Sequence, residues 1–161
     1  MKRKLVYLLL LPLLFACSGD NYEDLKSHPI VGTWELTDLS YSSEVDQGFI
    51  EEKINESINK EREKALRSNL ELTLDDDGNF TTRSNGDFIG QGRYKIKKNQ
   101  LIMSDSRTKL TSEFSLYFDE LYIDEDQTAY YKKSVSTMSD GADWSKSIHK
   151  VVITQSYKKK R

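Results

Sequence analysis

The sequence predicts an all-β fold, an antiparallel up-and-down barrel of about eight strands with one α-helix inserted after the first strand. From Ile30 onward, apolar and polar residues alternate with a period of two, which is typical of strands that bury one face. The short apolar runs are separated by turn sequences rich in Asp, Asn and Gly, such as 75–79 and 85–86. Many short strands joined by tight turns indicate an antiparallel barrel or sandwich.

The predicted strands can be followed along the chain by their alternation. The first begins near Ile30, and Leu70, Leu72 and Leu74 define the second. Gly90 and Gly92 lie within one of the later runs, as at a bend or a close backbone approach. The remaining strands are expected at about 80–83, 88–96, 101–103, 114–118, 121–123, 128–133 and 145–157.

One segment, from about Gln47 to Ser68, has a helical period instead. Its apolar residues form one stripe, and Glu56–Lys60 and Glu63–Arg67 form charged pairs four residues apart on the opposite face. The helix could pack on the barrel simply as structure, or it could form a lid over a cavity. The first interpretation is favoured, because an amphipathic stripe requires only a surface to pack against. The stripe consists of Phe49, Ile50, Ile54, Ile58, Ala65 and Leu66.

The N-terminus has the features of an export signal over residues 1–16. A basic start is followed by an apolar run from Leu5 to Ala16, which is about half the length needed to cross a bilayer. The stretch from Leu14 to Cys17 resembles the lipobox of bacterial lipoproteins. That resemblance implies that Cys17 is lipidated on sulfur, for example with palmitate, and becomes the new N-terminus. More than one acyl chain would anchor the protein stably in a membrane.

Residues 17–28 are predicted to form an acidic, flexible tether, leaving 29–161 as the barrel domain. The run that follows Cys17 is polar and acidic, as expected of a linker in which His28 is solvated. It also resembles the acidic export signal of surface lipoproteins of the Bacteroidota. This resemblance implies an extracytoplasmic protein that is lipid-anchored at the outer membrane or the cell surface.

The composition argues against a nucleic-acid partner and against disulfide bonds. The signal carries three of the 24 basic residues and none of the 26 acidic ones, so the mature chain has a net charge of −5. This charge argues against a nucleic-acid partner. Cys17 is the only cysteine, so no thiol remains for a disulfide once it is acylated. The basic run 158–161 is interpreted as a solvated end of the chain.

A Gly-x-Trp motif, formed by Gly32, Thr33 and Trp34, opens the first strand. It resembles the lipocalin signature, and the layout of residues 29–133 resembles the small lipocalin-like lipoproteins of the Bacteroidota. The resemblance implies a barrel whose closed bottom is plugged by Trp34. It also implies that a basic residue of the last strand, here Lys158 or Arg161, covers the tryptophan ring.

The sequence offers little for catalysis or for metal binding. His28 and His149 are the only histidines, and His149 alternates with Val151 and Ile153 as an inward-facing strand residue would. No nucleophile elbow, zinc-protease pair or phosphate loop is present. The Asp-rich run 75–79 suits a hairpin turn better than a calcium loop, and the acidic residues of 119–126 suit a solvated rim. We therefore expect no enzyme activity, cofactor or metal.

The function expected from these features is non-catalytic binding of a small, partly apolar ligand inside the barrel. An eight-stranded barrel is wide enough either to be filled by side chains or to hold one small ligand. The alternative is therefore a filled barrel that binds a protein of the cell envelope, as an accessory subunit of a surface complex, through the outer helix face and a mobile loop at 134–143. The expected inward-facing residues are Trp34, Leu36, Leu72, Phe80, Tyr94, Ile96, Met103, Leu116 and Phe118.

Overall fold

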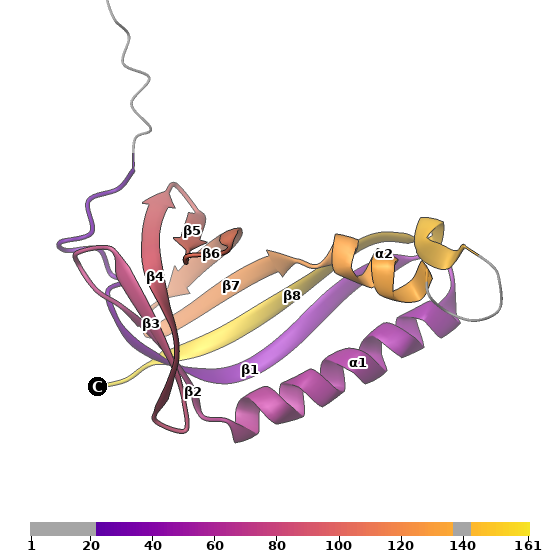
Figure 1. The fold of residues 1–161 in the computed structure, drawn as a ribbon, viewed down its shortest axis with the longest axis horizontal. Coiled ribbons are helices and arrows are strands. Elements are labelled where there is room, and N and C mark those ends of the chain that lie inside the picture. Colours follow the sequence, from indigo (N-terminus) through magenta and orange to yellow (C-terminus); the bar gives the residue numbers. More distant parts are fainter. Residues whose placement is uncertain (1–21, 137–142) are drawn as a thin grey trace, which may run out of the picture.

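The computed structural model describes residues 22–136 and 143–161 and confirms the predicted fold class. Eight antiparallel strands pair in chain order and close into a barrel, and β8 pairs with β1 (Figure 1). The export signal, Cys17 and most of the predicted 134–143 loop lie outside the described residues. The strands are β1 (Gly32–Val45), β2 (Leu70–Leu74), β3 (Asn79–Ser84), β4 (Asp87–Lys97), β5 (Gln100–Ser104), β6 (Lys109–Tyr117), β7 (Glu120–Asp126) and β8 (Ile148–Lys159).

Strands β1 and β8 are much longer than the part of the barrel that they close. Only four residues of β1, Gly32 to Glu35, pair with β2, whereas its pairing with β8 continues to Val45. The two strands therefore run out of the barrel as a ribbon, and β7 flanks β8 along this ribbon as far as the Asp126–Val152 pair. A bulge between Leu36 and Asp38 adds one residue to β1, so that Leu39 stays on the inner face.

Helix α1 (Gly48–Arg67) covers the inner face of this ribbon, as Figure 1 shows. Its 20 residues extend over about 30 Å, close to the ~33 Å of the ten strand residues 36–45, so the helix leads the chain back to the barrel. Ile50, Ile54 and Ile58 are buried against the ribbon. The predicted helix is thus confirmed, and its stripe has a structural role over most of its length.

A second helix, α2 (Thr128–Ser136), occupies the segment that was predicted as a strand over 128–133. That prediction was wrong. The carboxylate of Asp126 accepts a hydrogen bond from the backbone N–H of Thr128 at 2.9 Å, a contact typical of a helix start. Tyr131 and Val135, four residues apart, are buried in the same cluster as the stripe of α1. After the undescribed residues, a short 3-10 helix η1 (Trp144–Ser147) leads into β8.

The end of the barrel opposite the ribbon is filled by side chains, and we call it the closed end. Trp34 is fully buried, and its indole N–H donates to the backbone oxygen of Ile30 at 2.7 Å. Lys159 places its ammonium 5.1 Å from the centre of the Trp34 ring and donates to the oxygen of Pro29 at 3.0 Å. The residue that covers the tryptophan is therefore Lys159, and not Lys158 or Arg161.

Gly32 makes room for this lysine. Its φ is 146°, and a Cβ at this position would lie 2.7 Å from Cε of Lys159. The glycine of the Gly-x-Trp motif is therefore explained by the path of the lysine side chain over the tryptophan.

The segment that precedes β1 packs on the barrel, which corrects the expectation of a flexible tether for residues 22–28. The backbone N–H of Glu23 donates to the oxygen of Ile96 at 2.9 Å, and Leu25 packs against the barrel core. His28 is not solvated, because its side chain is only 14% exposed and its Nε2 lies 3.2 Å from the carboxylate of Glu23. Its Nδ1 accepts the N–H of Ile30, which fixes the path toward Trp34.

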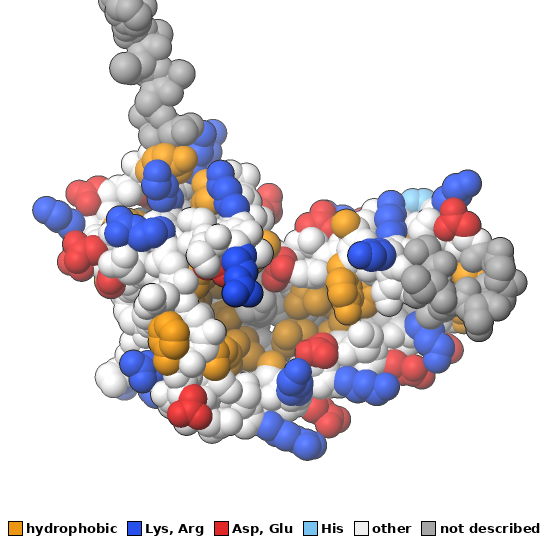
Figure 2. All heavy atoms as spheres, in the orientation of Figure 1, with side chains coloured by type: hydrophobic (Ala, Val, Ile, Leu, Met, Phe, Trp, Pro, Cys, Tyr) orange, Lys and Arg blue, Asp and Glu red, His pale blue; other side chains and the backbone are white. Residues whose placement is uncertain are grey.

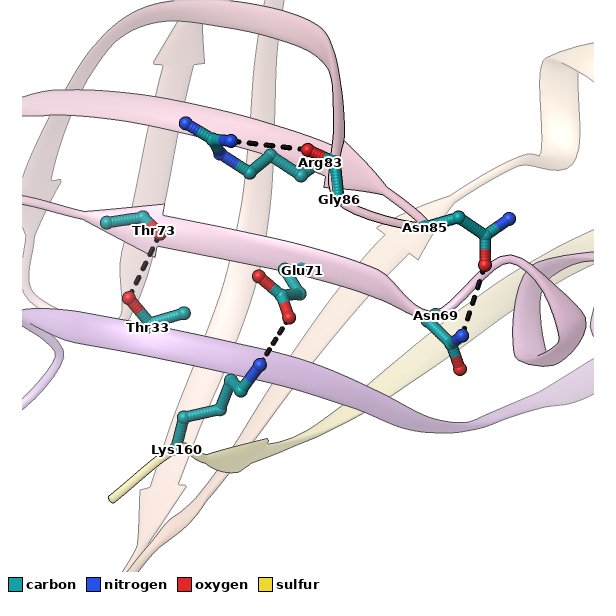
Figure 3. Close-up of polar contacts among 8 residues, drawn as sticks. All are labelled: Thr33, Asn69, Glu71, Thr73, Arg83, Asn85, Gly86 and Lys160. Atoms are coloured by element: carbon teal, nitrogen blue, oxygen red, sulfur yellow. Dashed lines mark hydrogen bonds and ion pairs between the residues drawn. The ribbon is translucent and has the colours of Figure 1, made fainter.

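The outer face of the sheet beside the closed end is tied together by polar contacts between strands (Figure 3). The hydroxyls of Thr33 and Thr73 lie 3.1 Å apart across β1 and β2, and Lys160 pairs with Glu71. The pairing with Glu71 raises the pKa of Lys160. Asn69 donates to Asn85 at 3.1 Å, which joins the start of β2 to the β3–β4 turn. These side chains satisfy one another, so this face is interpreted as structural.

The two glycines of β4 give a matched test of barrel packing. A Cβ at Gly92 would lie 2.2 Å from the backbone oxygen of Ser104 and 2.6 Å from the ring of Phe80, whereas a Cβ at Gly90 would meet no atom within 4 Å. We expect Gly92→Ala to lower the free energy of unfolding by about 1–3 kcal/mol through overpacking. Gly90→Ala should change it by no more than about 0.5 kcal/mol. Urea unfolding of both variants measures this, and equal effects would contradict the packing described here.

Candidate functional site

Eight of the nine predicted inward-facing residues belong to the core of the barrel. Trp34, Leu36, Leu72, Tyr94 and Ile96 are buried in one cluster around the closed end. Phe80, Met103 and Leu116 are partly buried and pack against that cluster. Most of these side chains therefore fill the closed end instead of lining a cavity.

Phe118 does not face inward, and its assignment was wrong. It lies in the two-residue turn between β6 and β7 with a φ of 55°, and its side chain is 88% exposed. The alternation of Phe114, Leu116 and Phe118 continues past the end of β6 at Tyr117, so the pattern extended one residue beyond the strand. The ring instead makes an edge contact with Tyr117, with ring centres 4.7 Å apart.

The other end of the barrel is open. Figure 2 shows the molecule hollowed between the barrel and the helix-covered ribbon, with hydrophobic side chains gathered on the walls of the hollow. The inner residues at this end are incompletely buried, unlike those around Trp34. Met103 on β5 is half-buried, and its partner Leu110 on β6, on the same face, is 39% exposed. Leu39 and Ile153 on the ribbon are also half-buried. We call this end of the barrel the mouth.

A polar group lies on the inner face at the mouth. Glu125 follows Leu121 and Ile123 at a period of two on β7, and both of those residues are in the barrel core. Its carboxylate accepts hydrogen bonds from the side-chain amide of Gln127 and, at 3.4 Å, from that of Gln155. The hydroxyl of Tyr157 in turn donates to Oε1 of Gln155 at 2.6 Å. The four side chains form a hydrogen-bonded chain that leads from the closed end to the mouth.

Partial burial controls the ionisation of this polar group. Removal from water raises the pKa of Glu125, and the hydrogen bond from Gln127 opposes that effect. Burial, with a smaller contribution from Glu125, also raises the pKa of Tyr157, so its phenol stays protonated as a donor. Within the described ranges, Glu125 forms no ion pair with any lysine, arginine or histidine. An inward carboxylate without a cation is the main chemical feature of the mouth.

Sequence reasoning assigned Glu125 to an acidic, solvated rim with its neighbours. The rim assignment suits Asp124 and Asp126, which line a hollow on the opposite, outer face of β6, β7 and β8. Extending the Leu121–Ile123 alternation by one step would have placed Glu125 inside. Gln155 would have followed from its position two residues before Tyr157 on β8. The half-exposure of Leu110 and Ile153 has no signal in the sequence, because it depends on how far neighbouring strands extend.

The remaining candidates do not assemble into a reactive site. His149 faces outward, with 54% of its side chain exposed, and its Nε2 lies 2.8 Å from Asp46. Asp75 accepts hydrogen bonds from the side-chain amide and backbone N–H of Asn79 and from the backbone N–H of Asp77, as expected of a hairpin turn, and these bonds hold the pKa of Asp75 below its usual value. Among the described residues, no three His, Cys, Asp or Glu side chains gather closely enough to hold a metal ion. No described helix has the length and apolar content to span a membrane.

Comparison with known proteins gives no family assignment. No protein-family model matches this chain, and no curated protein matches it significantly. The candidate site therefore depends on the geometry of the barrel itself.

The raised pKa of Glu125 predicts a specific pH dependence of stability. The pKa of Glu125 is higher in the folded protein than in the unfolded chain, so ionisation of Glu125 destabilises the fold. The native protein therefore loses stability relative to a Glu125→Gln variant as the pH rises from below the unfolded pKa to above the folded pKa. We expect the variant to gain stability relative to the native protein between pH 3 and pH 7. Urea unfolding at both values measures the difference. The exposed Glu113→Gln is the control, and an equal gain in that variant would show that the effect is not specific to Glu125.

Proposed function

We propose that this protein is a lipid-anchored envelope lipoprotein whose barrel binds a small, partly apolar ligand at its mouth without catalysis. The observation that supports this most directly is the contrast between the two ends of the barrel. The closed end is filled around Trp34, whereas at the mouth Leu110 is exposed and Met103 and Ile153 are only partly buried. A concave, mostly apolar surface with a few inward polar groups is typical of a small-molecule site.

The proposed location rests on the sequence of the N-terminus. The basic start, short apolar run and Cys17 together support export and lipidation of this cysteine. The acidic residues after Cys17 support a position at the outer membrane or the cell surface. The Gly-x-Trp motif, with Lys159 over the ring of Trp34, supports a relationship to lipocalin-like lipoproteins of the Bacteroidota.

A second function, binding of an envelope protein as an accessory subunit, is favoured by a separate observation. Exposed aromatic side chains lie on the helix-covered end of the molecule. Phe49 of α1 is 41% exposed and meets Trp144 edge-on, with ring centres 4.9 Å apart. Tyr130 of α2 is 61% exposed. Aromatic residues of this kind are enriched in protein interfaces.

Lipidation can be tested in cells with a clickable fatty acid. We expect the native protein to incorporate the label and to sediment with membranes. Cys17→Ser should lose both the label and the sedimentation, because the acyl chains are attached through this residue. Immunoblotting of the fractions confirms that both forms are made. A labelled, membrane-bound Cys17→Ser variant would contradict the proposed anchor.

Ligand binding at the mouth can be tested by native mass spectrometry after exposure to a lipid and metabolite extract of the cell envelope. Residues 22–161 are used, since they contain the whole described fold. The native domain should carry a discrete added mass. Leu110→Trp should lose that mass, because the larger ring fills the mouth. Thr111→Trp is the matched control, because it adds the same ring to the outer face of the same strand.

The outcomes separate the two proposed functions. Loss of the added mass in Leu110→Trp and its retention in Thr111→Trp would support ligand binding at the mouth. A bare protein mass throughout, with a strand-rich circular dichroism spectrum, would contradict the ligand-binding proposal. That result would favour the second function, binding of an envelope protein by the lipidated form.

A further inference from the structure

We infer that the ligand carries a positively charged amine on an apolar body, and that the carboxylate of Glu125 receives the amine. This inference rests on the proposed ligand-binding function and names the class of ligand. It derives from the position of Glu125, from its unused acceptor capacity and from the surfaces on either side of it.

Glu125 lies at the boundary between two apolar clusters. Its cross-strand partner on β8 is Ile153, which packs against the cluster beneath α1 and α2. Two residues earlier on β7, Ile123 belongs to the cluster of the closed end. The carboxylate is therefore located where the two clusters separate and the mouth opens. A ligand that enters the mouth would meet apolar surface on both sides of this one acidic group.

The carboxylate has capacity left for a ligand. An ionised carboxylate offers about four acceptor positions, and the hydrogen bonds that Glu125 forms with described residues use two of them, for the amides of Gln127 and Gln155. Both amides are neutral, so they position the carboxylate without neutralising it. The hydrogen bond from Tyr157 to Gln155 fixes the orientation of the Gln155 amide toward Glu125. The site is thus a preoriented negative charge that lacks a positive partner within the described residues.

The walls define the rest of the ligand. Leu39 pairs with Gln155 across β1 and β8, and Met103 pairs with Leu110 across β5 and β6, so apolar side chains flank the polar group on two strand pairs. A half-buried carboxylate costs free energy that an ammonium ion can recover by forming a charge-assisted hydrogen bond in apolar surroundings. An alkylamine satisfies both requirements, because its head pairs with Glu125 and its chain covers the exposed Leu110 and the half-buried Met103.

The test compares three single-chain probes of equal length with residues 22–161, each used below its micelle concentration. Dodecylamine carries a positive head, dodecanol a neutral one and dodecanoate a negative one. Titration calorimetry should show that dodecylamine binds most tightly. Glu125→Gln should weaken dodecylamine binding about tenfold or more, because a hydrogen bond between charged partners is lost, and should leave dodecanol binding unchanged.

Two further variants control for total charge and for folding. Glu113→Gln removes one negative charge from the exposed outer face of β6 and should not change the order of affinities. Glu125→Asp keeps the charge on a shorter side chain and should retain the preference for dodecylamine over dodecanol. Thermal unfolding confirms that each variant is folded. Equal effects of Glu113→Gln and Glu125→Gln would overturn the role of Glu125.

The result also distinguishes this inference from the function on which it rests. Binding of all three probes without a preference, unaltered in Glu125→Gln, would overturn the amine specificity and leave ligand binding in place. A preference for dodecanoate would likewise overturn it. Failure of the folded native domain to bind any probe would overturn the amine inference, while the envelope extract tests ligand binding independently.

Discussion

The unequal length of the strands is the constraint on which the rest of this structure depends. β1 pairs with β2 through only four residues but continues along β8 to Val45, so a ribbon leaves the barrel with one apolar face uncovered. Covering that face requires an amphipathic element of matching length, which α1 provides, and α2 completes the cover at the far end (Figure 1). The hollow lies between the barrel and the part of the ribbon that the helices cover (Figure 2).

The closed end depends instead on the mutual packing of a few side chains. The indole N–H of Trp34 needs an acceptor and its ring needs a covering surface, and these are the oxygen of Ile30 and the side chain of Lys159. Lys159 can take this path only because Gly32 has no Cβ. Packing of this kind is rigid, which suits a base that supports a more open end.

Most strands and the long helix could be predicted from the sequence, because alternation and turn residues are local signals. The segment 128–133 was mispredicted because consecutive tyrosines favour a strand, whereas burial of Tyr131 against α1 stabilises a helix. Glu125 was missed because the acidic residues around it suggested one shared solvent-facing role. The alternation of Leu121 and Ile123 places it on the inner face, and its pairing with Ile153 of β8 agrees with that placement.

The start of the described chain has a consequence for how the molecule would stand on a membrane. Residues 22–28 are packed against the barrel, so only residues 18–21 lie between this packed segment and Cys17. They can span at most about 18 Å. An anchor at Cys17 would therefore keep the barrel close to the lipid headgroups. The arm formed by α1, α2 and the ribbon extends from the barrel on the side away from the start of the described chain (Figure 1). That arm would be the first part met by a protein approaching from the aqueous side.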